Sequence, residues 1–326
     1  IENNIVAPHL ERQSMQGATV YRDKRAPADE RYKLWSKFRP TDQQIAEGMR
    51  SGLWAMYSAD GIHWQSYPNQ PQPPNQSCDT QNMFFWDERE KLYVGYTRVR
   101  ETQSTEKAAA AGKIACRSIG RITSPDFRIW SKTQIILEAD EQDLTIPTPS
   151  KIDEQHPCID YYTSCALKYE SAQDVYLMFP SVHYHWGENG FPATLDTQLL
   201  SSRDGINWQR QGDRRPFLRH GIDNSLRSGM LFANPWLVPV GDELWLYYAS
   251  MPYHHGSEPE KIEQRSGLFR ASMRHDGFVS ADTGFGGGGP KPPPRRPRRP
   301  AQKRHHKCAF KACGLGIHDV SIARRL

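Results

Sequence analysis

Short runs of aromatic and β-branched residues alternate along this chain with short polar segments. Such runs come in pairs at 82–86 and 91–96, at 163–169 and 174–179, and at 236–239 and 244–248. Each pair, with the polar turn between its members, predicts two antiparallel strands. A weaker pair covers 18–21 and 32–35, and short helices are expected only at 41–49 and 106–111.

A recurring phrase, Ser-x-Asp-Gly-x-x-Trp, follows these pairs. It is complete at 58–64 and 202–208, weaker at 124–130, and reduced to Asp-Gly-Phe at 276–278. Asp-Gly favours a tight turn, because Gly adopts positive φ freely and the Asp side chain accepts hydrogen bonds from nearby amides. The Trp adds an apolar anchor. The phrase therefore predicts an outer-strand hairpin with a structural role rather than a chemical one.

The copies of this phrase stand about 70 residues apart, and a fixed period of that kind indicates a repeat architecture. The repeating units cover approximately 17–68, 79–136, 160–211 and 230–282. Each holds about four strands, which is the content of one β-propeller blade. The sequence thus predicts an all-β propeller with four blades present.

Charge divides the chain into two parts. The formal net charge of the 326 residues is +5, yet segment 286–326 carries about 11 Lys and Arg against one Asp. The part before it is therefore net negative, and we expect no nucleic-acid binding by the folded part. We predict a propeller domain at 1–285 and a Pro/Arg/Gly-rich segment at 286–326 with the composition of a disordered tail.

Two interpretations of the segment 286–326 remain open. It is either a basic arm for nucleic acid or an anionic surface, or the translation of GC-rich DNA in a shifted frame. The first residues, from Ile1, begin without an initiator Met, so we expect the N-terminus to be that of a fragment or a processed end. No apolar run reaches the ~18–20 residues of a membrane span. A secreted or periplasmic location is expected only if a longer gene product carries a signal peptide.

Several segments resemble a known superfamily. Residues 79–82, 85–87 and 93–96 resemble the five-bladed β-propeller glycoside hydrolases, which include arabinanases, β-xylosidases, levanases and invertases. Segments 174–181 and 276–280 are similar to uncharacterised bacterial glycosyl hydrolases of that type. The resemblance covers roughly residues 1–285. It implies a five-bladed propeller, here incomplete, that acts on a carbohydrate.

The same resemblance suggests where acid/base residues lie. Propellers of this superfamily place acidic side chains on the innermost strands of successive blades. Asp79 and Asp160 each open such a strand and fit two of these roles, although either could instead cap a turn. For the general acid we expect Glu188, in a loop whose aromatic and imidazole neighbours could raise a carboxyl pKa, or Asp196, at a later strand.

Histidine and aromatic side chains are expected to contact the sugar. Aromatic faces stack on pyranose rings, and imidazole binds a hydroxyl group or a metal ion. The candidates are His183, His185, Trp186, Tyr253 and His254. Because no carboxylate has a matching sequence spacing, the residues predict no metal ligand set and no cofactor. The family resemblance still allows a structural divalent cation in the channel.

The leading hypothesis is a glycoside hydrolase that cleaves a poly- or oligosaccharide by carboxylate acid/base catalysis. A non-catalytic carbohydrate-binding propeller is the alternative. Two carboxyl groups about 5–9 Å apart would favour catalysis, and a single one would favour binding. A protein-interaction propeller is a third hypothesis, and the aromatic side chains Trp186 and Tyr253 argue against it.

Overall fold

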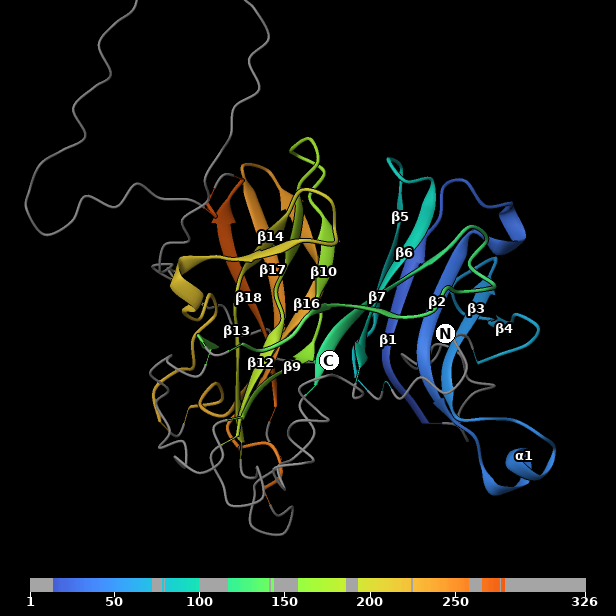
Figure 1. Ribbon diagram of the computed structural model, residues 1–326, viewed down its shortest axis with the longest axis horizontal. Coiled ribbons are helices and arrows are strands. Elements are labelled where there is room, and N and C mark those ends of the chain that lie inside the picture. Colours follow the sequence, from blue (N-terminus) through green and yellow to red (C-terminus); the bar gives the residue numbers. More distant parts are fainter. Residues whose placement is uncertain are drawn as a thin grey trace, which may run out of the picture.

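The computed structural model describes residues 14–71, 78, 80–99, 117–140, 142–143, 158–185, 193–223, 225–257, 266–275 and 277–278. Within them the chain is almost entirely β, and its sheets form four blades in a propeller-type arrangement (Figure 1). This confirms the predicted fold class. The segment 286–326, the expected helix at 106–111 and residues 1–13 lie outside the described residues.

The first two blades are regular four-stranded antiparallel sheets. Blade 1 consists of β1 (Ser14–Arg22), β2 (Tyr32–Arg39), β3 (Gly52–Ser58) and β4 (Gln65–Ser66). Blade 2 consists of β5 (Met83–Asp87), β6 (Leu92–Val99), β7 (Ser118–Ser124) and β8 (Gln134–Leu137). The strand pairs at 18–21 and 32–35 and at 82–86 and 91–96 are confirmed.

The third blade is divided across its middle. Its inner half holds β9 (Cys158–Thr163), β12 (Ser181–His185) and β13 (Ala193–Thr197). Its outer half holds β10 (Ala166–Lys168), β11 (Tyr176–Met178), β14 (Leu200–Ser202) and β15 (Trp208–Arg210). The break has a local cause, because Pro180 has no N–H for the ladder and Cys165 has a φ of 41°.

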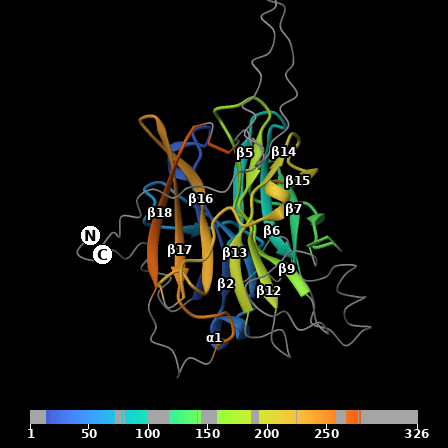
Figure 2. The same cartoon turned by 90° about the vertical axis from the view of Figure 1, so that its left-hand side faces the viewer.

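The fourth blade joins the inner half of the third. It consists of β16 (Met230–Val240), β17 (Glu243–Met251) and β18 (Gly267–Arg274). A parallel contact between Leu195 and Met230 links β13 to β16. The resulting six-stranded sheet has the order β18-β17-β16-β13-β12-β9, which can be followed across Figure 2.

The recurring phrase forms the predicted turn. Ser58 Oγ accepts the amides of Asp60 and Gly61, while Asp60 Oδ1 accepts those of residues 62 and 63. The copy at 202–208 repeats this pattern. Gly61 and Gly205 have φ values of 80° and 72°. Each turn closes an outer hairpin, so the structural role predicted for the phrase is confirmed.

The core lies mainly between blades. Trp35 of blade 1 stacks on Trp130 of blade 2 with ring centroids 4.6 Å apart, and Phe85 of blade 2 lies against Tyr176 of blade 3. Burying these large rings between neighbouring sheets is the main apolar contribution that holds the blades together.

Helical structure is sparse in the described residues. The helix α1 (Asp42–Ala46) begins with a capping box between Thr41 and Gln44, as the segment 41–49 predicts. Two 3-10 turns cover Ala28–Glu30 and Gly212–Arg214. None of the helices described could cross a membrane.

Candidate functional site

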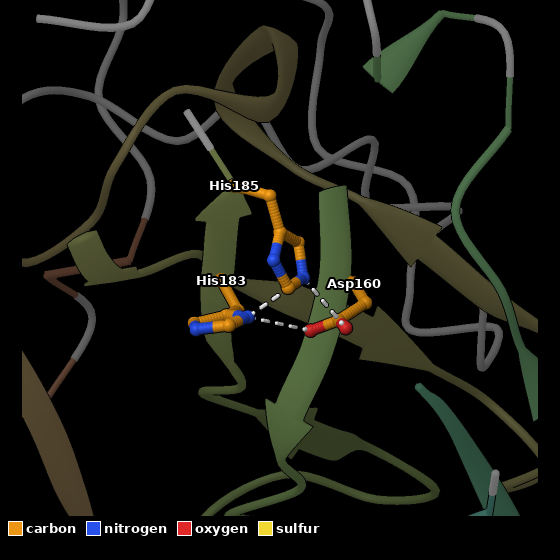
Figure 3. A group of neighbouring side chains, drawn as sticks. All are labelled: Asp160, His183 and His185. Atoms are coloured by element: carbon orange, nitrogen blue, oxygen red, sulfur yellow. Dashed lines mark hydrogen bonds and ion pairs between the residues drawn. The ribbon is translucent and has the colours of Figure 1, made fainter. Parts of the chain in front are cut away.

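A buried cluster of Asp160, His183 and His185 lies on the inner half of blade 3 (Figure 3). Asp160 is on β9, and both histidines are on β12. Residues two apart on a strand project from the same face, so His183 and His185 point the same way. In the β9–β12 pairing Asp160 lies directly opposite His183, which places the carboxylate beside both imidazole rings.

The three side chains converge through their ligand atoms. His183 Nδ1 lies 3.2 Å from Asp160 Oδ1, and His185 Nε2 lies 3.0 Å from Asp160 Oδ2. The two imidazole nitrogens are 2.9 Å apart. All three residues are almost completely buried, with at most 1% of each exposed. The result is a compact triangle of one oxygen pair and two nitrogen atoms.

A ring of polar and aromatic groups surrounds this triangle. Arg117 donates to Asp160 Oδ2 at 2.7 Å, and its guanidinium lies 5.1 Å from the centroid of the Tyr162 ring. The Tyr162 hydroxyl lies 3.1 Å from His255 Nε2. His255 is held in place by two backbone hydrogen bonds to Ala193 on β13. Two sequence-distant histidine segments thereby meet at one site.

The charge state of the cluster follows from burial and hydrogen bonding. Burial by itself would raise the pKa of Asp160, but the interactions with His183, His185 and Arg117 outweigh it and hold that pKa well below its ordinary value. Desolvation lowers the pKa of His183 to about 3 despite the nearby Asp160. At neutral pH the cluster therefore contains an ionised carboxylate and a neutral His183.

Asp196 lies on the other face of the same sheet. It pairs with Val182 on β12, one residue out of phase with His183, so its side chain projects away from the cluster. The Tyr184 hydroxyl donates to Asp196 at 3.1 Å. Burial raises the Asp196 pKa to about 8. Asp196 has the protonation state of a general acid, but the structure does not bring it together with Asp160.

The remaining predicted residues divide into two groups. Asp79, Glu188 and Trp186 lie outside the described residues, so their roles stay predictions. Tyr253 and His254 are partly buried on the loop after β17, next to His255. His183 and His185, expected in a loop, belong instead to strand β12.

Sequence reasoning missed the link between Asp160 and the histidines, as well as Arg117 and Tyr162. A signal was present for the histidines, because a His-x-His pair within a strand places both rings on one face. Because residues 183–185 were expected in a loop, the alternation of side chains between the two faces of a strand was not applied to them. The Asp160 contact depends on the register of β9 against β12, which the spacing along the chain does not define.

A separate open pocket of about 610 Å³ lies beside the ends of β1, β5 and β10. Its walls include Trp86 at the end of β5, Lys168 at the end of β10, and Trp236. Asp160, by contrast, lies near the start of β9. The Arg25 guanidinium covers the Trp86 ring at 3.1 Å from its centroid, so this aromatic face is already occupied.

Comparisons with known proteins found similarity in solved structures. An N-acetylgalactosamine deacetylase from F. plautii is 14% identical with a TM-score of 0.46, and covers 73% of this chain. A β-1,2-mannobiose phosphorylase from Listeria innocua is 16% identical with a TM-score of 0.46, and covers 80%. A β-fructofuranosidase from Schwanniomyces occidentalis is 12% identical with a TM-score of 0.49, and covers 83%.

This chain spans 63%, 58% and 46% of the lengths of those three proteins, respectively. No family model and no curated protein matches the chain. At these identities and TM-scores the similarities assign no reaction and no site residue, which have to come from the geometry of this chain.

Proposed function

We propose that this protein hydrolyses O-glycosyl bonds of a poly- or oligosaccharide beside Asp160. The observation that supports the proposal is the buried carboxylate of Asp160 on β9, whose pKa is held well below its ordinary value and which Arg117 contacts at 2.7 Å. Glycoside hydrolysis requires one ionised and one protonated carboxyl group on either side of the scissile bond. Asp160 fits the ionised member of that pair.

The protonated partner is then Glu188 or Asp79. Asp196 is unsuited to this role despite its raised pKa, because it projects from the opposite face of the β12–β13 ladder. Arg117 and the two histidines keep Asp160 charged and in one orientation, which is the fixed electrostatic environment that an oxocarbenium-like transition state requires.

A non-catalytic carbohydrate-binding propeller is the second candidate. One specific observation favours it: Asp160 already interacts with Arg117, His183 and His185. A carboxylate with three partners is less available to attack a sugar or to activate water. Under this alternative the channel binds a saccharide without cleaving it.

Activity assays on the intact protein separate the two candidates. We expect release of product from a panel of aryl glycosides and polysaccharides, and a loss of at least about 100-fold in kcat/KM in Asp160→Asn. The same loss is expected in Asp79→Asn or Glu188→Gln for whichever residue is the acid. Asp196→Asn is the matched control and keeps its activity, with folding checked by circular dichroism.

Unchanged turnover in Asp160→Asn would remove Asp160 from the mechanism. If no substrate in the panel is cleaved and a polysaccharide nevertheless binds saturably in calorimetry, the binding propeller is correct instead. Neither outcome depends on the identity of the sugar being known beforehand.

A further inference from the structure

The hydrogen bonds within the Asp160–His183–His185 triangle are short of one hydrogen atom. Three contacts of 2.9, 3.0 and 3.2 Å join its corners. His183 Nδ1 and His185 Nε2 can each carry one hydrogen, whereas an ionised carboxylate carries none. Two hydrogen atoms cannot form a hydrogen bond in each of the three contacts. If both nitrogens carry a hydrogen, the contact between the two rings brings two N–H groups together. If only one nitrogen carries a hydrogen, the other nitrogen faces a carboxylate oxygen with no hydrogen between them.

A cation at the centre of the triangle would satisfy all three edges at once. Nitrogen and oxygen ligands bind Zn²⁺ at about 2.0–2.1 Å, which places neighbouring ligand atoms roughly 2.9 Å apart in octahedral and 3.3 Å apart in tetrahedral geometry. The three observed separations fall within that interval. The two nitrogens therefore have the spacing of neighbouring ligands, and each has one oxygen of the Asp160 carboxylate at such a spacing.

We propose that Asp160, His183 and His185 form a binding site for one divalent first-row transition-metal ion of the Zn²⁺ type. Two imidazoles with one carboxylate are a donor set for zinc, iron, cobalt or nickel, whereas Ca²⁺ and Mg²⁺ prefer oxygen ligands throughout. Three protein ligands leave at least one coordination position for water or for an oxygen atom of a bound molecule.

The surroundings of the site are consistent with this assignment. The side chains of Asp160, His183 and His185 are almost completely buried, with at most 1% of each exposed, so the surrounding sheet fixes the positions of the three proposed ligands. Arg117 Nη1 lies 2.7 Å from Asp160 Oδ2 and 3.4 Å from His183 Nδ1, so the guanidinium borders the triangle and orients the carboxylate that would ligate the ion. The guanidinium charge beside the cation would favour an anionic group in the open position.

Metal binding is measured directly and does not depend on the proposed hydrolysis. The intact protein, stripped with a chelator, is titrated with Zn²⁺ in calorimetry and with Co²⁺ by visible absorption. We expect one equivalent of high affinity, a cobalt d–d band typical of nitrogen and oxygen ligands, and a melting temperature that rises with metal concentration. A tenfold excess of Ca²⁺ should not displace the ion.

Three variants test the ligand set. Asp160→Asn, His183→Ala and His185→Ala should each weaken Zn²⁺ binding by at least 100-fold and abolish the cobalt band. His220→Ala is the matched control, because the Nε2–H of this ring donates to the Leu195 carbonyl at 2.7 Å rather than to the triangle. His305 and His306 also lie beside Cys308 in the sequence, so the double variant His305→Ala/His306→Ala must retain the high-affinity equivalent.

Two results would overturn the proposal. One is the absence of a high-affinity equivalent in a stripped protein whose circular dichroism shows that it is folded. In that case Arg117 alone compensates the negative charge of the Asp160 carboxylate. The other is loss of binding in the His305/His306 variant together with full binding in His183→Ala. A protein that binds zinc but cleaves no glycoside would leave this inference intact and contradict only the proposed hydrolysis.

Discussion

Asp196 is a buried carboxyl group whose main polar contact in the described structure is the hydroxyl of Tyr184. Burial raises its pKa from 3.8 to about 8, so the folded protein retains a proton that the unfolded chain releases above pH 4. The folded state thus binds more protons between these two values, and stability falls as pH rises from about 4 to about 8.

We expect Asp196→Asn to remove this pH dependence, because an amide keeps an oxygen for Tyr184 but cannot ionise. The measurement is the free energy of unfolding in urea at pH 5 and pH 8 for both proteins. The wild type should lose more stability than the variant, with each unit of pKa shift corresponding to about 1.4 kcal/mol. Parallel pH profiles would show that Asp196 ionises normally in the folded state.

At this scale the sequence identifies residues one at a time but not their neighbours. The sequence predicts Asp160, His183 and His185 each as a candidate, Asp160 from its place at the start of a predicted inner strand and the histidines from their aromatic neighbours. Their meeting depends on Asp160 standing opposite His183 in the β9–β12 ladder. A shift of one residue in that register would turn the carboxylate to the other face, and residue spacing alone does not exclude such a shift.

Among the elements, the recurring turn is where sequence and structure agree most closely. Its residues specify a local conformation through their own hydrogen bonds, so no distant contact is needed to predict it. The division of blade 3 is different. Pro180 marks the break, yet the pairing of the inner half with blade 4 arises from the contact of Leu195 with Met230, which joins segments that no local pattern relates.

The two complete copies of the turn provide a matched pair of substitutions. Gly61→Ala and Gly205→Ala both place a side chain at positive φ. Each substitution should lower the free energy of unfolding by about 1–2 kcal/mol for this reason alone. At Gly61 the new Cβ would have its nearest neighbours at 3.8 Å, whereas at Gly205 it would stand 2.7 Å from the Tyr96 hydroxyl. That hydroxyl donates to the Gly205 carbonyl at 2.8 Å, so the second substitution also disturbs a buried hydrogen bond.

We therefore expect Gly205→Ala to lower the free energy of unfolding more than Gly61→Ala, by about a further 1 kcal/mol. Chemical denaturation of the two variants and the wild type measures the difference. Equal losses at the two sites would show that the Tyr96 contact between blades 2 and 3 contributes nothing beyond the turn itself.

For the whole molecule, the spacing of the repeats predicts how many blades there are but not how they are joined. The joints use hydrogen bonds and ion pairs between residues far apart in the sequence. Arg89 in the first turn of blade 2 donates to the carbonyls of Arg203 and Asp204 in the turn of blade 3. Such contacts follow from the angle between adjacent sheets, which a one-dimensional pattern does not contain.

The strongest of these joints offers two carboxylates that share the same arginines but differ in burial. Arg214 of blade 3 contacts both Asp140 and Asp143, at 2.5 and 2.7 Å, and Arg210 also reaches both. Both acidic residues follow β8 of blade 2. The Asp143 side chain is fully buried, whereas that of Asp140 is 48% exposed.

Removing one partner of a buried ion pair leaves the other charge without compensation, which lowers the free energy of unfolding by about 3 kcal/mol or more. An exposed ion pair contributes at most about 1 kcal/mol to that free energy. We expect Asp143→Asn to lower the free energy of unfolding by about 3 kcal/mol and Asp140→Asn by less than about 1 kcal/mol. Urea denaturation at neutral pH measures both losses. In 1 M salt the loss caused by Asp140→Asn should shrink more than the loss caused by Asp143→Asn.

Similar losses in the two variants would mean that solvent reaches Asp143. The boundary between blades 2 and 3 would then be held by its aromatic packing rather than by these ion pairs.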